Sequence, residues 1–178
     1  MTWEPAGPAW LFCPADRPER YGKAAAAADV VIIDLEDAVA AADKPAAREA
    51  LAASSLDPDR TVIRVNAHGT GDLGADLEVL TRTDYRRVML AKTESAEQVR
   101  ALESYEVVAL IESPLGAVMV NEIASAENVI GAMWGAEDLM AALGGNSSRF
   151  SDGSYRDVAR HVRTSTLLAT KARGLFAL

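Results

Sequence analysis

The chain has 178 residues, of which 49% are hydrophobic and 25% charged, and its formal net charge is −8. This composition is typical of a globular domain, and the acidic balance argues against nucleic acid as the main partner because phosphate binding needs a basic face. No apolar stretch approaches the roughly 18 residues of a membrane span. The single cysteine, Cys13, excludes an intrachain disulfide and, with no signal-peptide pattern at the N-terminus, favours a cytoplasmic protein.

Short apolar runs recur along the chain and are nearly free of polar residues, which is typical of strands buried on both faces of a parallel sheet. The predicted strands are 9–13, 30–33, 62–65, 88–90, 107–111, 129–133 and 175–178. Between them, helical patterns predict helices over 44–53, 95–102, 116–124 and 155–171. Ser95 is the expected N-cap of the second helix, and 144–153 is expected to be an exposed loop. This alternation predicts an α/β fold.

Polar side chains follow nearly every predicted strand, and their distribution decides between two α/β architectures. A (β/α)₈ barrel gathers functional residues at the carboxyl ends of many strands, whereas a doubly wound sheet concentrates them at one switch point. The strand-end residues here are Asp16, Arg17, Asp34, Glu36, Asp37, Arg64, Asn66, Lys92, Glu94, Glu112, Glu137 and Asp138. We therefore predict a TIM (β/α)₈ barrel, with 1–178 forming a single domain.

A complete barrel of this type takes about 250 residues. The chain stops inside the seventh predicted strand, where an unpaired apolar edge would be exposed. We therefore expect the barrel to be incomplete, with its C-terminal part missing from this sequence.

Glu112 and Asp138 follow the fifth and sixth predicted strands and are the candidate metal ligands. Carboxylate oxygens, completed by water and substrate oxygens, are what Mg²⁺ prefers. The two histidines, His68 and His161, offer no cluster for zinc. In the alternative interpretation, Glu112 caps the following helix and Asp138 forms a surface ion pair.

Arg64 lies within an apolar run, where an arginine is costly unless it is paired. Its structural role would be an ion pair with Glu36, Asp37 or Glu112, and its functional role would be to bind a substrate carboxylate with its planar guanidinium. The two roles are compatible. Glu36 and Asp37 stand together after the second strand and need a cation, either a metal or Arg64.

Two weaker patterns concern anion binding. Arg17, Arg20 and Lys23 form a basic patch that is either a solvated face or a site for the phosphates of a large anionic cofactor. Gly135 and Ala136 offer backbone N–H groups that would bind an oxyanion or a carboxylate, or would simply form a tight turn.

The sequence resembles the citrate lyase β-subunit-like branch of the HpcH/HpaI aldolase family. Matching blocks occur in the family's order along nearly the whole chain. They are 11–14 with Arg17 and Lys23, 34–39 with Lys44 and 47–48, then 64–66, 91–94, 111–116 and 135–139. The segments Asp-Leu-Glu-Asp-Ala-Val and Gly-Ala-Glu-Asp-Leu carry most of the resemblance.

This resemblance implies a TIM barrel that binds Mg²⁺ through Glu112 and Asp138, with Glu36 and Asp37 near the metal-bound waters. It implies that Arg64 and the backbone of Gly135 and Ala136 hold a small 2-oxo acid such as oxaloacetate or a β-hydroxy acid. It also implies an acyl-CoA or acyl-carrier thioester as the other partner, and a homotrimer. The expected reaction is lyase or synthase chemistry on a malyl-, citramalyl- or citryl-type thioester, with thioester hydrolysis as a variant.

Two other functions remain open at this point. An HpaI-like aldolase would use pyruvate enolate without CoA, and loss of the basic patch would then have no effect. A non-catalytic CoA-binding protein, or an accessory subunit of a citrate lyase complex, would keep the fold without turnover. The presence of Glu112, Asp138 and Arg64 argues against this last reading.

Overall fold

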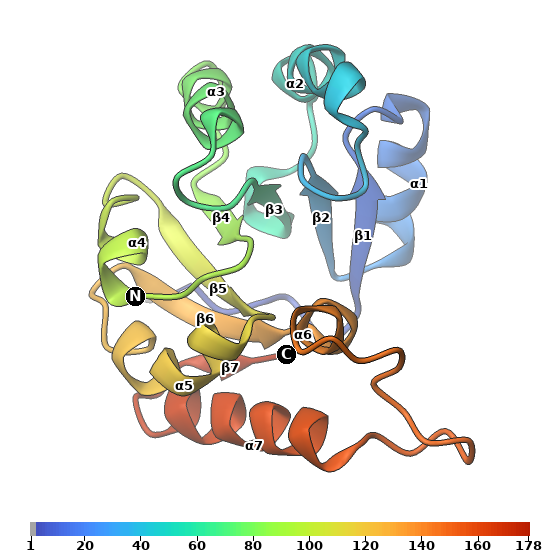
Figure 1. Ribbon diagram of the computed structural model, residues 1–178. Coiled ribbons are helices and arrows are strands. Elements are labelled where there is room, and N and C mark those ends of the chain that lie inside the picture. The colour runs from blue at the N-terminus through green and yellow to red at the C-terminus, as the bar shows by residue number, and fades with distance from the viewer. Residues whose placement is uncertain (1–2) are drawn as a thin grey trace. The chain divides into compact units, whose positions relative to one another are not determined.

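The computed structural model describes residues 3–178, which divide into two compact units, one extending to Met89 and the other from Leu90 to Leu178. In both units helices and strands alternate along the chain (Figure 1) and the strand order follows the chain order. The division describes local compactness, and the interpretation of 1–178 as one domain stays a prediction.

The N-terminal unit is built on parallel strands that alternate with helices. The pairing of the first two strands begins at Trp10 and Val30, and that of the next two at Val31 and Thr61. The elements are β1 (Trp10–Pro14), α1 (Pro18–Ala27), β2 (Val30–Asp34), α2 (Lys44–Ala52), β3 (Thr61–Val65), α3 (Gly71–Leu80) and β4 (Arg87–Leu90), with 3₁₀ turns η1 (Ala41–Asp43) and η2 (Pro58–Arg60). The boundary between the units falls inside β4.

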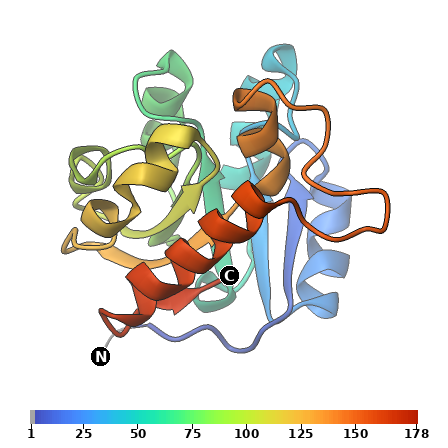
Figure 2. The ribbon, with the colours of Figure 1, turned by 60° about the horizontal axis from the view of Figure 1, so that its bottom comes forward.

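The C-terminal unit repeats the same pattern. Its elements are α4 (Ala96–Arg100), β5 (Glu106–Ile111), α5 (Pro114–Ile123), β6 (Val129–Trp134), α6 (Ala136–Ala142), α7 (Asp157–Lys171) and β7 (Phe176–Ala177). β6 pairs in parallel with both β5 and β7. The long helix α7 packs against β6, β7 and α5 (Figure 2). Gly131 allows the Phe176 ring to lie where a Cβ atom would otherwise be, 2.4 Å from the nearest ring carbon.

Strand burial agrees with the expectation from the apolar runs in most strands, but not in β1, where Leu11 and Phe12 are exposed. All five residues of β2 are buried, as are the last five residues of β5. Cys13 is a buried free thiol whose pKa is raised by that burial, which confirms it as a core residue. Parallel strands in chain order with intervening helices confirm the α/β class and the incomplete (β/α)₈-barrel fold, with seven strands where a complete barrel has eight.

Three helices were absent from the sequence prediction: α1, α3 and α6. The first is rich in alanine and so lacks an apolar stripe, and the second contains Gly71 and Gly74 and places the charged side chain of Asp76 on its buried face. The third has only seven residues, too few to establish a helical period. The predicted cap Ser95 is confirmed, since its hydroxyl accepts a hydrogen bond from the amide of Gln98.

The segment between α6 and α7 is mostly exposed, as predicted, and Figure 2 shows it extending away from both helices. It is nevertheless anchored at one point. Ser148 is fully buried, and its hydroxyl donates to Oε1 of Glu137 at 2.5 Å. Within residues 3–178, no helix is long and apolar enough to cross a membrane.

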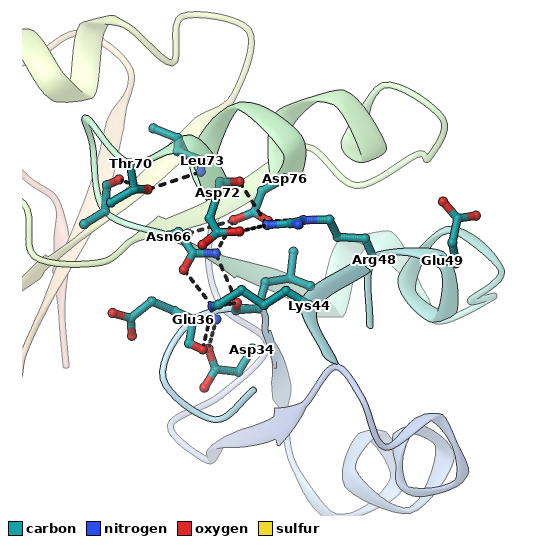
Figure 3. A network of polar contacts seen from close by, with 12 residues as sticks. Asp34, Glu36, Lys44, Arg48, Glu49, Asn66, Thr70, Asp72, Leu73 and Asp76 are labelled. Carbon is teal, nitrogen blue, oxygen red and sulfur yellow. Dashed lines mark hydrogen bonds and ion pairs between the residues drawn. The ribbon is translucent and has the colours of Figure 1, made fainter. Parts of the chain in front are cut away.

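A buried polar network ties α2 to α3 and to the end of β3 (Figure 3). The guanidinium of Arg48 donates to the carboxylates of Asp76 (2.8 Å) and Asp72 (2.7 Å). Asp76 has no exposed surface and also accepts hydrogen bonds from the backbone and side-chain amides of Asn66, at 2.9 and 2.7 Å. These contacts satisfy the buried charge and fix the segment that follows β3.

We predict that Asp76→Ala destabilises the protein by about 3–5 kcal/mol, because it leaves Arg48 and Asn66 without their buried acceptor. The matched variant Asp72→Ala removes the other, partly exposed carboxylate from the same arginine and is expected to cost less than about 1 kcal/mol. Urea denaturation of both variants checks this difference. If the two variants lose similar amounts of unfolding free energy, the burial of Asp76 does not make it more important for stability than Asp72.

Candidate functional site

The two predicted metal ligands lie at neighbouring strand ends of the C-terminal unit. Glu112 immediately follows the last residue of β5, and Asp138 lies in the first turn of α6, just after β6. Because β5 and β6 are paired and parallel, their carboxyl ends meet at one edge. The carboxyl groups of Glu112 and Asp138 are close enough to hydrogen-bond.

Glu112 is a carboxylate held away from water, with only 4% of its surface exposed. The backbone N–H of Lys92 donates to its Oε1 at 2.9 Å. On the other side, Gly135 lacks the Cβ atom that would lie 2.8 Å from Oε2 of Glu112. Burial raises the pKa of Glu112 to about 8; the Lys92 amide opposes this shift and the nearby charge of Asp138 adds to it.

These donors fit a divalent magnesium ion. Two adjacent carboxylates, one of them desolvated, concentrate negative charge that a hard cation would neutralise. The structure forms no cluster of three or more His, Cys, Asp or Glu suited to a metal within residues 3–178. Mg²⁺ keeps several water ligands and takes one or two carboxylates together with substrate oxygens. The assignment of Glu112 and Asp138 as ligands stays a prediction.

The alternative roles of these two carboxylates can be compared with the geometry. The cap of α5 is Ser113, whose hydroxyl accepts from the amide of Gly116, so Glu112 is not the capping residue. Ser113 in turn donates to Glu94 at 2.7 Å. Asp138 does form an ion pair, at 4.0 Å from Nζ of Lys92, and both side chains are partly exposed.

Arg64, in β3 of the N-terminal unit, is held by a carboxylate on the neighbouring strand. Its Nε and Nη2 donate to the two carboxylate oxygens of Asp34, at 2.7 and 2.5 Å, and Nη1 lies 3.2 Å from Glu36. The guanidinium also stacks on Phe12, 5.0 Å from the ring centroid. Of the three predicted partners the structure places Glu36 beside Arg64, and it adds Asp34. Asp34 and Arg64 are paired with each other in the parallel register of β2 and β3.

The predicted acidic pair after β2 is split between two environments. Glu36 is buried, whereas Asp37 is exposed and donates its amide to Oε2 of Glu36. The nearby ammonium of Lys44 is also buried and donates to the carbonyl oxygens of Leu35 and Glu36 and to Asn66, at 2.6–3.0 Å (Figure 3). This lysine fixes the backbone of the acidic loop.

The structure places the predicted anion-binding groups in different hydrogen-bonding environments. The amide of Gly135 donates to the carbonyl of Ile111 at 2.9 Å, so this N–H already has an acceptor. The prediction of backbone N–H binding therefore rests on Ala136, and Gly135 matters for its close approach to Glu112. Arg17 lies at the start of α1 with an exposed side chain, 3.7 Å from Asp16.

The rest of the basic patch borders a cavity of about 360 Å³ in the N-terminal unit. Its walls are mainly apolar, with two cationic side chains among them: Leu11, Phe12, Cys13, Pro14, Ala24, Arg20 and Lys23. An apolar cavity with cations at its border suits a ligand that combines a hydrophobic part with phosphates.

The contacts made by three residues at these sites, Asp34, Lys92 and Ser148, were not predicted from the sequence. Asp34 ends a strand and looks like part of the acidic cluster, although its position opposite Arg64 in a parallel pair is a usable signal. Lys92 acts partly through its backbone, and the hydrogen bond between Ser148 and Glu137 joins residues separated by a loop. Sequence patterns carry no signal for contacts of these two kinds.

Parallel strands with acidic side chains at their carboxyl ends define an α/β-barrel protein of the kind that carries its site on strand ends. Residues 9–178 match the HpcH/HpaI aldolase/citrate lyase family, and the chain belongs to it. The resemblance noted in the sequence is thus confirmed.

The chain is similar to several individual proteins of this family. A citrate lyase subunit beta-like protein of Mycobacterium tuberculosis is 62% identical over the whole chain. An L-malyl-CoA/beta-methylmalyl-CoA lyase of Rhodobacter capsulatus is 34% identical over 159 residues, covering 75% of this chain and 49% of that protein. The solved structure of M. tuberculosis CitE with magnesium, acetoacetate and coenzyme A matches with a TM-score of 0.96 and 63% identity, covering 97% of this chain and 64% of that one.

A second solved structure, the M. tuberculosis citrate lyase beta subunit with oxaloacetate and magnesium, has a TM-score of 0.97 at 62% identity. It covers 99% of this chain and 79% of that one. The chain spans 65% of the length of its M. tuberculosis beta-like relative.

We predict that Glu112→Gln makes the metal-free protein more stable at high pH. The carboxyl pKa is 4.5 when unperturbed and about 8 in the fold, so the folded state binds the proton more tightly and loses stability as pH rises between these values. Glutamine retains its hydrogens and escapes this loss. Thermal unfolding in EDTA should show similar stabilities near pH 5 and a more stable variant near pH 9, by an amount on the order of a few kcal/mol.

The exposed residue Glu122 on α5 supplies the control, because Glu122→Gln should follow the wild type at both pH values. If Glu112→Gln is no more stable than the wild type near pH 9, burial does not raise the pKa of the Glu112 carboxyl group as described above.

Proposed function

We propose that this chain belongs to a Mg²⁺-dependent carbon–carbon lyase or synthase that acts on a β-hydroxyacyl-CoA of the malyl, citramalyl or citryl type. The observation that carries the proposal is the buried carboxylate of Glu112 beside Asp138 at two adjacent strand ends. Support comes from the M. tuberculosis structures with magnesium, coenzyme A and oxaloacetate, and from the malyl-CoA lyase relative.

In the proposed site, Glu112 and Asp138 hold the metal, and Glu36 and Asp37 orient the water molecules around it. When bound, Mg²⁺ supplies a Lewis acid for the oxygen of the 2-oxo acid or of the β-hydroxyl group. The amide of Lys92 keeps Oε1 of Glu112 in one orientation, so the ligand does not have to be ordered during binding.

Arg64 is proposed to bind the small acid and to stabilise the charge that develops on its oxygen. Asp34 occupies the Nε and Nη2 edge of the guanidinium, which fixes the plane of the group. The backbone N–H of Ala136 is proposed to contact the carboxylate of the same acid, with Gly135 giving the chain its close approach.

In the cleavage direction, the β-hydroxyl group loses its proton and the carbon–carbon bond breaks. The electron pair of the broken bond stays on the α-carbon of the thioester, giving an enolate that is protonated there to acyl-CoA, while the hydroxyl carbon becomes the carbonyl of a 2-oxo acid. Condensation is the reverse. Thioester hydrolysis after condensation is a further proposed step. We also infer a cytoplasmic homotrimer, an inference that rests on the family resemblance and, for the compartment, on the single cysteine.

We predict that the protein, incubated with Mg²⁺, cleaves one member of a panel of malyl-, citramalyl-, methylmalyl- and hydroxymethylglutaryl-CoA. Mass spectrometry should detect free acyl-CoA and an oxo acid, which is a 2-oxo acid for the malyl-, citramalyl- and methylmalyl-type thioesters and acetoacetate for hydroxymethylglutaryl-CoA. Both products should disappear with EDTA and in the variants Glu112→Ala and Asp138→Ala. Reaction of pyruvate with an aldehyde, without any thioester cleavage, would overturn the proposal in favour of an aldolase. Acetyl-CoA binding without turnover would favour the non-catalytic alternative.

A second prediction concerns the basic cavity beside α1. The variant Arg20→Ala/Lys23→Ala should raise KM for the thioester about tenfold and leave kcat nearly unchanged, because the CoA phosphates take no part in the bond that breaks and contribute only uniform binding. Lys171→Ala, at the end of α7, is the matched control and should leave both constants unchanged. A fall in kcat alone, or no effect on KM, would exclude this cavity as a binding site for the CoA part.

A further inference from the structure

Lys92, in the turn after β4, has an unusual backbone. It is the one non-glycine residue within 3–178 with a positive φ, at 49°. The left-handed region costs an L-residue with a long side chain about 1–2 kcal/mol, and only Gly, Asn and Asp visit it routinely. Such strain persists only where the surrounding structure imposes it, and it occurs preferentially at functional sites.

The next residue, Thr93, holds this turn in place. It is fully buried, its amide donates to the carbonyl of Leu110 at 3.1 Å, and its hydroxyl donates to that of Leu90 at 2.7 Å. Its own carbonyl oxygen lies only 2.3 Å from the position that a Cβ atom on Gly116 would occupy. With Thr93 fixed on both sides, the left-handed conformation of Lys92 directs its N–H towards Glu112.

Lys92 therefore contacts both carboxylates of the candidate metal site by different groups. Its backbone N–H donates to Oε1 of Glu112 at 2.9 Å, and its ammonium lies 4.0 Å from Oδ2 of Asp138. The side chain of Lys92 is 38% exposed, so its ammonium can move without leaving a buried cavity behind. The protein thus carries a positive charge of its own beside the two carboxyl groups of the candidate metal site.

We propose that Lys92 is a built-in counter-ion of this site, whose ammonium stays beside Asp138 in the metal-free protein and moves away when a divalent cation binds. The inference rests on the proposed function, since it takes Glu112 and Asp138 as the ligands. Two cations beside the same carboxylate repel each other, so the lysine weakens metal binding. In return, it offsets the negative charge of Asp138 when no metal is present.

The chemistry of lysine suits this exchange. Its ammonium is a compact, strongly hydrated charge on a flexible four-carbon stem. The stem allows the charge to withdraw towards solvent while the backbone N–H stays on Glu112. Lys92 acts here as a positioning residue through its backbone and as a regulator of metal affinity through its side chain.

The test is a titration with Mn²⁺ alone, followed by the electron paramagnetic resonance signal of the free ion. Lys92→Met should bind Mn²⁺ about tenfold more tightly than the wild type, because a positive charge close to the metal position is gone. Its metal-free form should unfold at a lower temperature. Lys92→Arg should restore the wild-type affinity to within about twofold, since it keeps the charge.

Two further variants separate charge from conformation. Lys92→Gly accepts the left-handed backbone without strain and should bind Mn²⁺ as tightly as Lys92→Met. Lys171→Met removes an exposed lysine at the end of α7 and should bind as the wild type does. A role of Lys92 that is only structural predicts weaker or unchanged binding in every variant, and never tighter binding.

The possible failures are distinguishable. If the wild type binds no Mn²⁺, or if binding survives in Glu112→Gln/Asp138→Asn, the metal site of the proposed function is wrong, and the role of Lys92 is wrong with it. If the wild type binds Mn²⁺ through these carboxylates but Lys92→Met binds it equally or more weakly, only the counter-ion role is overturned.

Discussion

The candidate site depends on one constraint: the carboxylate of Glu112 is removed from water and lies beside a second carboxylate, that of Asp138. A buried charge of this kind is costly, and the fold compensates for it only in part, through the Lys92 amide and through the ammonium near Asp138. The remaining cost appears as the raised pKa of Glu112. A divalent cation would remove it, which is why the arrangement is better explained as a binding site than as a structural ion pair.

The N-terminal unit also contains buried charged groups, but they are stabilised in a different way. Its buried charges are matched within the protein itself: Arg64 with Asp34 and Glu36, and Arg48 with Asp76. The buried ammonium of Lys44 donates hydrogen bonds to three oxygen atoms of the protein, which take the place of water. These pairs hold the loops after β2 and β3 in one conformation, which suits a substrate-binding role because a group that is already oriented loses little entropy when it binds.

Most of the strands, and the site residues named for them, could be predicted from the sequence. Apolar runs mark buried parallel strands directly, and polar residues at their ends mark the edge where a site is expected. Glu112, Asp138 and Arg64 were named as candidates in this way, and their roles stay predictions. The helix α3 was not predicted, because the charged residue Asp76 interrupts the apolar residues on its buried face, and the partner of Asp76, Arg48, lies in another helix. The role of Lys92 could not be predicted either, since it depends on a backbone angle and an amide direction that do not follow from residue type.

The central claim is that Glu112 and Asp138 together hold a divalent cation, and anomalous diffraction from crystals of the protein soaked in Mn²⁺ tests it most directly. The account predicts an anomalous peak bonded to carboxylate oxygens of both residues, with water completing the coordination. A peak bonded to other side chains, or no peak under conditions where Mn²⁺ is in excess, would contradict it.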